Sequence, residues 1–95
     1  IMAHYVMLST VTARGARTLK TRPSRIKEVN AEVEKMGGRI LAQYALLGSY
    51  DFITVIEAAD DETAARISLE VSSRGSVKIL TIPAIPVDDF ISGIR

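Results

Sequence analysis

The segment PSRIKEVNAEVEKM, residues 23 to 36, restricts the fold of this chain more than any other stretch. Its apolar residues recur at steps of three and four, and charged side chains occupy the remaining positions, which is typical of an amphipathic helix. Pro23 suits the first helical turn, where its missing N–H costs nothing, and Gly37-Gly38 is a helix stop. The segment is predicted to be one helix that buries the stripe Ile26, Val29, Val33 and Met36.

A second full helix is predicted after residue 59. Asp60, Asp61 and Glu62 place acids at the positive end of its dipole, and Gly75 ends it. Its inner face is predicted to consist of Ala64, Ile67 and Val71. A shorter helix over residues 13–20 is weakened by its internal Gly15.

The other segments have no helical period and are rich in β-branched and aromatic residues, so they are predicted to be strands. They span residues 4–10, 39–47, 51–58 and 76–82. Gly48-Ser49 between the second and third strands predicts a hairpin with a two-residue type II′ turn. Tyr50 and Asp51 would then stand on opposite faces at the head of the third strand.

The element order strand, helix, strand, strand, helix, strand is that of the ferredoxin-like split βαβ fold. We therefore expect a single α+β domain over residues 2–95, with a four-stranded antiparallel sheet and both long helices on one face. Right-handed crossovers would put the first and third strands in the centre.

Both faces of the predicted sheet are apolar, although one face should be polar if it met water. The alternating sets are Tyr5 and Met7 against Val6 and Leu8, Phe52 and Ile56 against Ile53 and Val55, and Val77 and Ile79 against Leu80 and Ile82. Hydrophobic residues make up 47% of the chain and the mean hydropathy is +0.19, which is high for 95 residues. We expect a second copy to cover the open face, giving a homodimer or a higher homo-oligomer.

Three stretches of the chain, AHYVMLSTVT, RIKEVNAEVEKMGGRILAQYALLGSYDFITVIEA and SRGSVKILTIPAIPVDDF, resemble the GYD-domain family. The signature of that family appears here as Gly48-Ser49-Tyr50-Asp51. The resemblance covers essentially the whole chain and implies a dimeric α+β barrel. It implies no catalytic residue, because the family is functionally uncharacterised.

The candidates for acid–base catalysis are few. Tyr50 and Asp51 form an adjacent phenol–carboxylate pair, but adjacent strand residues point apart, and aspartate commonly accepts backbone hydrogen bonds at turns. We therefore favour a structural role for this pair. His4 and Tyr5 are the other weak catalytic candidates.

A mostly apolar interior with a few convergent polar groups is the usual form of a small-ligand pocket. The residues predicted to line one are Tyr5, Met7, Ser9, Gln43, Tyr44 and Thr54, with Thr81 as a further polar strand residue. A satisfied core without a ligand explains the same pattern equally well.

No cysteine is present and His4 is the single histidine, so we expect no metal site and no cofactor. A haem needs only one axial ligand, which leaves His4 as its one candidate. A cysteine-free chain also fits the cytoplasm.

The net charge is +1, yet half of the twelve cations precede the first acid, Glu28. We interpret the basic stretch 14–27 as a solvated face. The motif that RRM domains use for stacking on RNA is missing from the third strand, so no nucleic-acid partner is expected. No apolar run approaches the ~20 residues of a membrane helix, so no membrane partner is expected either.

These observations favour a small dimeric α+β barrel protein that binds a small ligand. A cofactor-independent enzyme of the monooxygenase or isomerase type is the alternative, and a structural or regulatory oligomer without ligand is a third interpretation.

Overall fold

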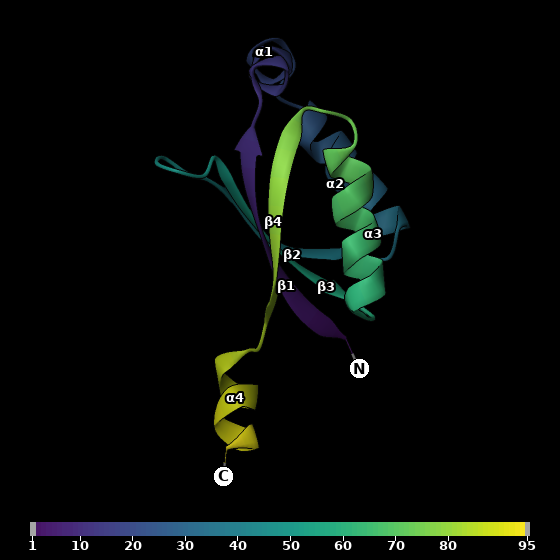
Figure 1. Cartoon of the computed structure of the whole chain (residues 1–95), viewed down its shortest axis with the longest axis vertical. Coiled ribbons are helices and arrows are strands. Elements are labelled where there is room, and N and C mark those ends of the chain that lie inside the picture. Colours follow the sequence, from purple (N-terminus) through teal and green to yellow (C-terminus); the bar gives the residue numbers. More distant parts are fainter. Residues whose placement is uncertain (1, 95) are drawn as a thin grey trace.

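The computed structural model describes residues 2–94 and contains one four-stranded antiparallel sheet. The strand order is β2-β3-β1-β4, which puts the first and third strands in the centre as predicted. Helices α2 and α3 lie on one face of the sheet, α1 lies at one end, and α4 extends from the opposite end (Figure 1). The ferredoxin-like fold class is confirmed. The elements are β1 (Ala3–Val11), α1 (Ala13–Thr21), α2 (Arg25–Lys35), β2 (Arg39–Ala45), β3 (Phe52–Ala58), α3 (Asp61–Ser72), β4 (Val77–Ala84) and α4 (Val87–Gly93).

Both long helices form where the periodicity predicted them. Asp60 is the N-cap of α3 and accepts a hydrogen bond from the Thr63 N–H at 2.9 Å. The predicted first-turn position of Pro23 is wrong. Ser24 is the N-cap of α2, and Pro23 belongs to the turn before it, where its carbonyl accepts from the Ile26 N–H.

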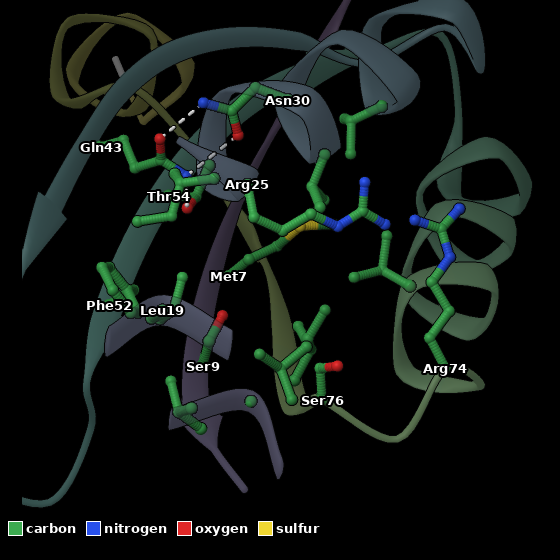
Figure 2. A pocket seen from close by; sticks show the side chains of 18 of the residues that line it. Met7, Ser9, Leu19, Arg25, Asn30, Gln43, Phe52, Thr54, Arg74 and Ser76 are labelled. Atoms are coloured by element: carbon green, nitrogen blue, oxygen red, sulfur yellow. Dashed lines mark hydrogen bonds between the residues drawn. The ribbon is translucent and has the colours of Figure 1, made fainter. Parts of the chain in front are cut away.

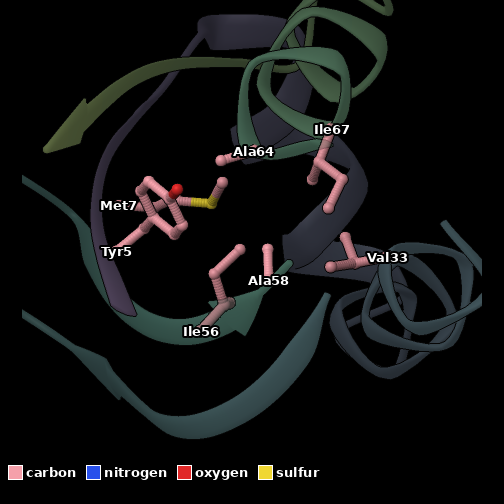
Figure 3. Packing of buried hydrophobic residues seen from close by; sticks show 7 residues of the cluster. All are labelled: Tyr5, Met7, Val33, Ile56, Ala58, Ala64 and Ile67. Atoms are coloured by element: carbon pink, nitrogen blue, oxygen red, sulfur yellow. The ribbon is translucent and has the colours of Figure 1, made fainter. Parts of the chain in front are cut away.

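The hydrophobic core lies toward one end of the space between the helices and the sheet (Figure 3). It joins the first half of β1 and the second half of β3 to the end of α2 and the start of α3. Its fully packed members are Tyr5, Met7, Val33, Ile56, Ala58, Ala64 and Ile67. Gly38 lets the chain pass this core, since a Cβ there would lie 2.9 Å from both Val33 Cγ1 and Ile67 Cδ1. The side chains of the core thus fill the space between the helices and the sheet at this end.

The connection between β2 and β3 differs from the predicted two-residue turn. Residues 46–51 lie outside both strands, and the Leu46 N–H donates to the Asp51 carbonyl at 2.7 Å. Gly48 has φ of 131°, a value that side chains disfavour, so glycine is needed there within a longer loop. Leu47 at the loop tip is fully exposed. The hairpin prediction was right about the reversal and wrong about its length, because the strands stop pairing at Ala45 and Phe52.

The tail after β4 forms a helix that was not predicted from the sequence. None of the residues of α4 is buried. The segment exposes five large apolar side chains, Ile85, Val87, Phe90, Ile91 and Ile94. It makes the molecule 50 Å long against 28 and 18 Å in the other directions.

No helix among residues 2–94 has the length and apolarity that crossing a membrane requires.

Candidate functional site

A cavity of about 430 Å³ lies between the sheet and helices α1, α2 and α3. It occupies the end of the helix layer that the core leaves open, between the first half of α2 and the last half of α3. Most of its wall is apolar. The apolar residues are Met7, Val11, Leu19, Ile26, Val29, Val33, Ile40, Phe52, Ile56, Ile67, Val71, Val77 and Ile79.

Four of the predicted ligand residues line this cavity: Met7, Ser9, Gln43 and Thr54. Strand register brings them together, since Met7 and Gln43 are both paired with Thr54. A bulge in β2 is part of the reason. Ile40 pairs with Ile56 and Ala42 with Val55, so one extra residue shifts Gln43 onto the face that the helices cover.

A hydrogen-bonded polar group at one side of the cavity joins α2, β2 and β3 (Figure 2). Asn30 Nδ2 donates to Gln43 Oε1 at 2.7 Å, and Gln43 Nε2 donates to Asn30 Oδ1 at 3.2 Å and to Thr54 Oγ1 at 3.0 Å. Thr54 is buried, and its hydroxyl hydrogen stays available as a donor because Oγ1 acts as the acceptor from Gln43.

Three arginines from three helical regions complete the wall: Arg14 of α1, Arg25 of α2 and Arg74 just after α3. Figure 2 shows the guanidinium groups of Arg25 and Arg74 pointing toward one another. Glu32 joins them, with Oε1 at 2.5 Å from Arg74 Nη1 and Oε2 at 3.5 Å from Arg25 Nη1. From the sequence, Arg14 and Arg25 were expected on a solvated face, and Arg74 was not among the predicted site residues.

Glu28 lies outside the cavity beside Arg25. Its Oε1 accepts from Arg25 Nη1 at 3.1 Å, and its other oxygen pairs with Arg22. These hydrogen bonds, that of Arg25 first, hold the pKa of the Glu28 carboxyl below its usual value. The carboxylate therefore stays ionised and partly neutralises the arginines at the mouth of the cavity, by which we mean the side lined by Arg14, Arg25 and Arg74.

Tyr5, predicted both as a catalytic and as a ligand-binding candidate, belongs to the core and not to this cavity. It is 2% exposed, and its hydroxyl donates to Asp61 Oδ1 at 2.5 Å. That hydrogen bond, with burial and the negative charge of Asp61, raises the pKa of Tyr5 to about 12. Tyr5 and Asp61 also line a shallower hollow of about 530 Å³ between α3 and β4. The chain thus holds a phenol–carboxylate pair, formed by residues other than the adjacent Tyr50 and Asp51.

His4 and Tyr44 lie on the open face of the sheet, away from the cavity. His4 Nε2 is 3.6 Å from Glu57 Oε2, whose other oxygen is 3.5 Å from Arg39 Nη1. Tyr44 is 65% exposed. The bulge that turns Gln43 inward turns Tyr44 outward.

Tyr50 and Asp51 lie in the loop before β3 and not within the strand. Asp51 Oδ2 accepts from the Val11 N–H at 2.7 Å, and the Asp51 N–H donates to the Ser9 carbonyl at 2.8 Å. These bonds fasten the loop to the end of β1. They agree with the favoured interpretation of the pair as part of a turn.

Among residues 2–94, no three His, Asp or Glu side chains gather closely enough to hold a metal ion.

The fold and the cavity define a small ferredoxin-like α+β protein with an apolar, arginine-rimmed chamber under its helices. The chain belongs to the GYD-domain family, whose model matches residues 5–94.

One relative is 53% identical over 95 residues, which is 99% of this chain and 100% of the relative. That protein, from Thermus thermophilus, is named "Glutamine synthetase and cystathionine beta-lyase binding protein". The crystal structure of MtbAldR matches with a TM-score of 0.67 at 15% identity, over 88% of this chain and 52% of the other. This chain therefore spans about half the length of the MtbAldR chain, and the likeness concerns the fold alone.

Proposed function

We propose that this chain is a non-catalytic binding protein that docks on enzymes of amino-acid metabolism and regulates them. The observation that carries the proposal is the segment 85–94, which contains α4. Its large apolar side chains are 40% to 70% exposed, and none of them belongs to the core. Exposed apolar surface of this kind is typical of a binding site for another protein. The name of the Thermus relative supplies the candidate partners, glutamine synthetase and cystathionine beta-lyase.

Biolayer interferometry against the purified Thermus enzymes tests this function. Phe90→Asp places a charge on the exposed face of α4 and is expected to weaken binding at least about tenfold, because an aromatic anchor is lost. Leu69→Asp on α3 is the matched control, since Leu69 is even more exposed at 72%. Failure of the unaltered protein to bind either enzyme would contradict the proposal.

We also propose that the open sheet face forms a homodimer. The register aligns two apolar rows across all four strands: Tyr44, Ile53, Leu8 and Leu80, and next to it Ala42, Val55, Val6 and Ile82. The polar row of Arg39, Glu57 and His4 borders them on one side. An apolar centre with a polar rim is the usual anatomy of a protein interface.

Sedimentation velocity at micromolar concentration tests the dimer. Leu80→Glu is expected to give a monomer, because Leu80 lies within the first row and is 47% exposed. Leu69→Glu, away from the sheet face, is expected to leave the association unchanged. A strictly monomeric unaltered protein would rule the dimer out.

A second function, binding of a small molecule, is supported by the cavity under the helices. Its volume lies within the range of about 300–1,000 Å³ that small-ligand sites occupy. The charged residues of its wall, within residues 2–94, are all arginines, and the catalytic candidates His4, Tyr5, Tyr50 and Asp51 lie elsewhere. This favours binding over the monooxygenase or isomerase alternative, which requires a base at the ligand.

We propose that these roles are carried out in the cytoplasm, which the cysteine-free composition fits.

A further inference from the structure

The wall of the cavity contains a buried arginine donor that is ion-paired but not aligned with its partner oxygen. Arg74 Nη1 is shielded from solvent, and among residues 2–94 it makes no hydrogen bond. Glu32 Oε1 lies 2.5 Å away, which is an ion-pair distance, but the angle is not that of a hydrogen bond. Arg74 Nη1 thus has an ion-pair partner and still lacks an aligned acceptor, which a ligand oxygen in the cavity would supply.

Arg25 lies opposite this donor and strengthens the case for a negatively charged ligand group. The two guanidinium groups face each other across the opening (Figure 2), with Glu32 as their shared partner. Glu32 already offsets part of the repulsion between the two arginines, and each guanidinium has five N–H groups, more than its glutamate partners use, so a further carboxylate can bind there. The planar guanidinium also matches a carboxylate with two parallel hydrogen bonds.

The balance of charge at the mouth suits a single negative charge. Arg25 and Arg74 already have glutamate partners, namely Glu28, Glu32 and Glu70. Arg14, whose guanidinium lies beside Gly75, has no ion pair within residues 2–94. With Arg22, which also pairs with Glu28, four arginines face three glutamates, so one positive charge stays uncompensated.

The rest of the cavity wall is mostly apolar, which favours a ligand with an apolar body. Val29, Ile40, Phe52 and Val71 are among its mostly apolar lining, and they come from α2, β2, β3 and α3. The Asn30–Gln43–Thr54 group at the other side offers the Thr54 hydroxyl hydrogen to one acceptor atom of the ligand.

We propose that the cavity binds a small monocarboxylic acid with an apolar body, its carboxylate on Arg74 and Arg25 and its body between the helices and the sheet. The inference rests on the proposed small-molecule function and names the ligand class for it.

Two matched pairs of probes test the class: octanoate with octanamide, and 3-phenylpropionate with 3-phenylpropanamide. Each pair has one apolar body and differs in the charge of its head group. Calorimetric titration is expected to show each acid binding at least about tenfold more tightly than its amide, as charge-assisted hydrogen bonds to arginine imply. The side-chain amide signals of Asn30 and Gln43 in ¹H–¹⁵N NMR spectra are expected to shift with both members of each pair.

Substitutions assign the preference to the arginines. Arg74→Gln is expected to remove the tenfold preference for the acids while amide binding persists. Arg25→Gln, which leaves α3 and its ion pairs intact, is expected to reduce the same preference and serves if Arg74→Gln does not fold. Arg66→Gln in α3 is the matched control, because Arg66 is exposed and lies outside the cavity wall.

Different results overturn different parts of the argument. Equal affinities within the pairs, a preference that survives in both variants, or an equal loss in Arg66→Gln would overturn the carboxylate class alone. No heat and no shift of the Asn30 and Gln43 signals with any of the four probes would overturn small-molecule binding in the cavity, and the inference with it.

Discussion

Replacing Gly15 with alanine tests how α1 is seated on the sheet. Gly15 lies in the first turn of α1 and is buried. A Cβ at this position would lie 2.2 Å from the Ser76 carbonyl oxygen and 2.9 Å from Val11 Cγ1. Contacts below 3.0 Å essentially do not occur for real Cβ atoms, so the backbone at the start of β4 would have to move.

The size of the effect follows from what holds Ser76 in place. Its carbonyl accepts from the Thr12 N–H at 2.9 Å and from Thr12 Oγ1 at 3.1 Å, and each such bond contributes about 1 kcal/mol. Inserting a methyl group into a packed site costs about 1–3 kcal/mol. Alanine returns at most about 1 kcal/mol of helix propensity. Loss of about one of the two hydrogen bonds offsets this gain, so we expect Gly15→Ala to lower the free energy of unfolding by about 1–3 kcal/mol.

Urea denaturation followed by far-UV circular dichroism, at one protein concentration throughout, measures this change. Gly93→Ala is the matched control, because no atom lies within 4 Å of a Cβ built there, and its effect should stay within about 0.5 kcal/mol. A Gly15→Ala variant as stable as the unaltered protein, or more stable, would refute the described contact between α1 and the start of β4.

Three further substitutions address named hydrogen bonds. Tyr5→Phe removes the hydrogen bond to Asp61. Because folding raises the pKa of Tyr5 from 10.0 to about 12, the contribution of this bond to stability is fully present below about pH 10 and is lost as the pH rises through about 12. Urea midpoints of the unaltered protein should therefore fall over this pH range by an amount that is missing in the variant. Asp51→Asn weakens the bond that anchors the loop to β1 and should lower stability by about 1 kcal/mol with octanoate affinity unchanged, whereas lost affinity at unchanged stability would favour a site at Asp51. Asp60→Ala removes the N-cap of α3 and should cost about 1 kcal/mol at pH 7. The hydrogen bonds from Thr63 keep the pKa of Asp60 below 3.8, so the part of this cost that depends on the charge should be lost as the pH falls through the lowered pKa, and an unchanged cost in acid would contradict this account.

The fold was predictable because local pattern and long-range packing agree. The stripe of α2 ends in Val33 and Met36, which meet the core directly, and the alternation in β1 separates Tyr5 and Met7 from Val6 and Leu8 as predicted. The helix α4 was not predictable from such a pattern, since none of its residues is buried and its apolar residues therefore mark no core-facing side.

The polar residues of the cavity were predictable in part for the same reason. Strand alternation assigns Met7, Ser9 and Thr54 to one face. It cannot choose between Gln43 and Tyr44, because a bulge of one residue decides which of them turns inward.

The arginines of the cavity mouth could not be found from sequence spacing. Arg14, Arg25 and Arg74 are far apart along the chain, and the fold brings them to one opening. The concentration of cations in residues 14–27 was a signal, but a charged helix face in water has the same composition. Two of these cations, Arg14 and Arg25, face the cavity because of the way α1 and α2 pack near the sheet and α3, and this packing cannot be read from the composition.

The position of the core at one end of the helix layer has a consequence for internal motion. The end of α2 and the start of α3 are fixed by Val33, Ala64 and Ile67, whereas the first two turns of α2 and the last turn of α3 contain no fully buried residue, and the chain after α3 is linked to α2 by the Arg74–Glu32 ion pair. The helices can therefore separate at the cavity end while the core end stays closed, and such partial opening costs less than global unfolding. A ligand could enter by this movement, and amide hydrogens of the first turns of α2 should exchange with solvent faster than those beside Ile56.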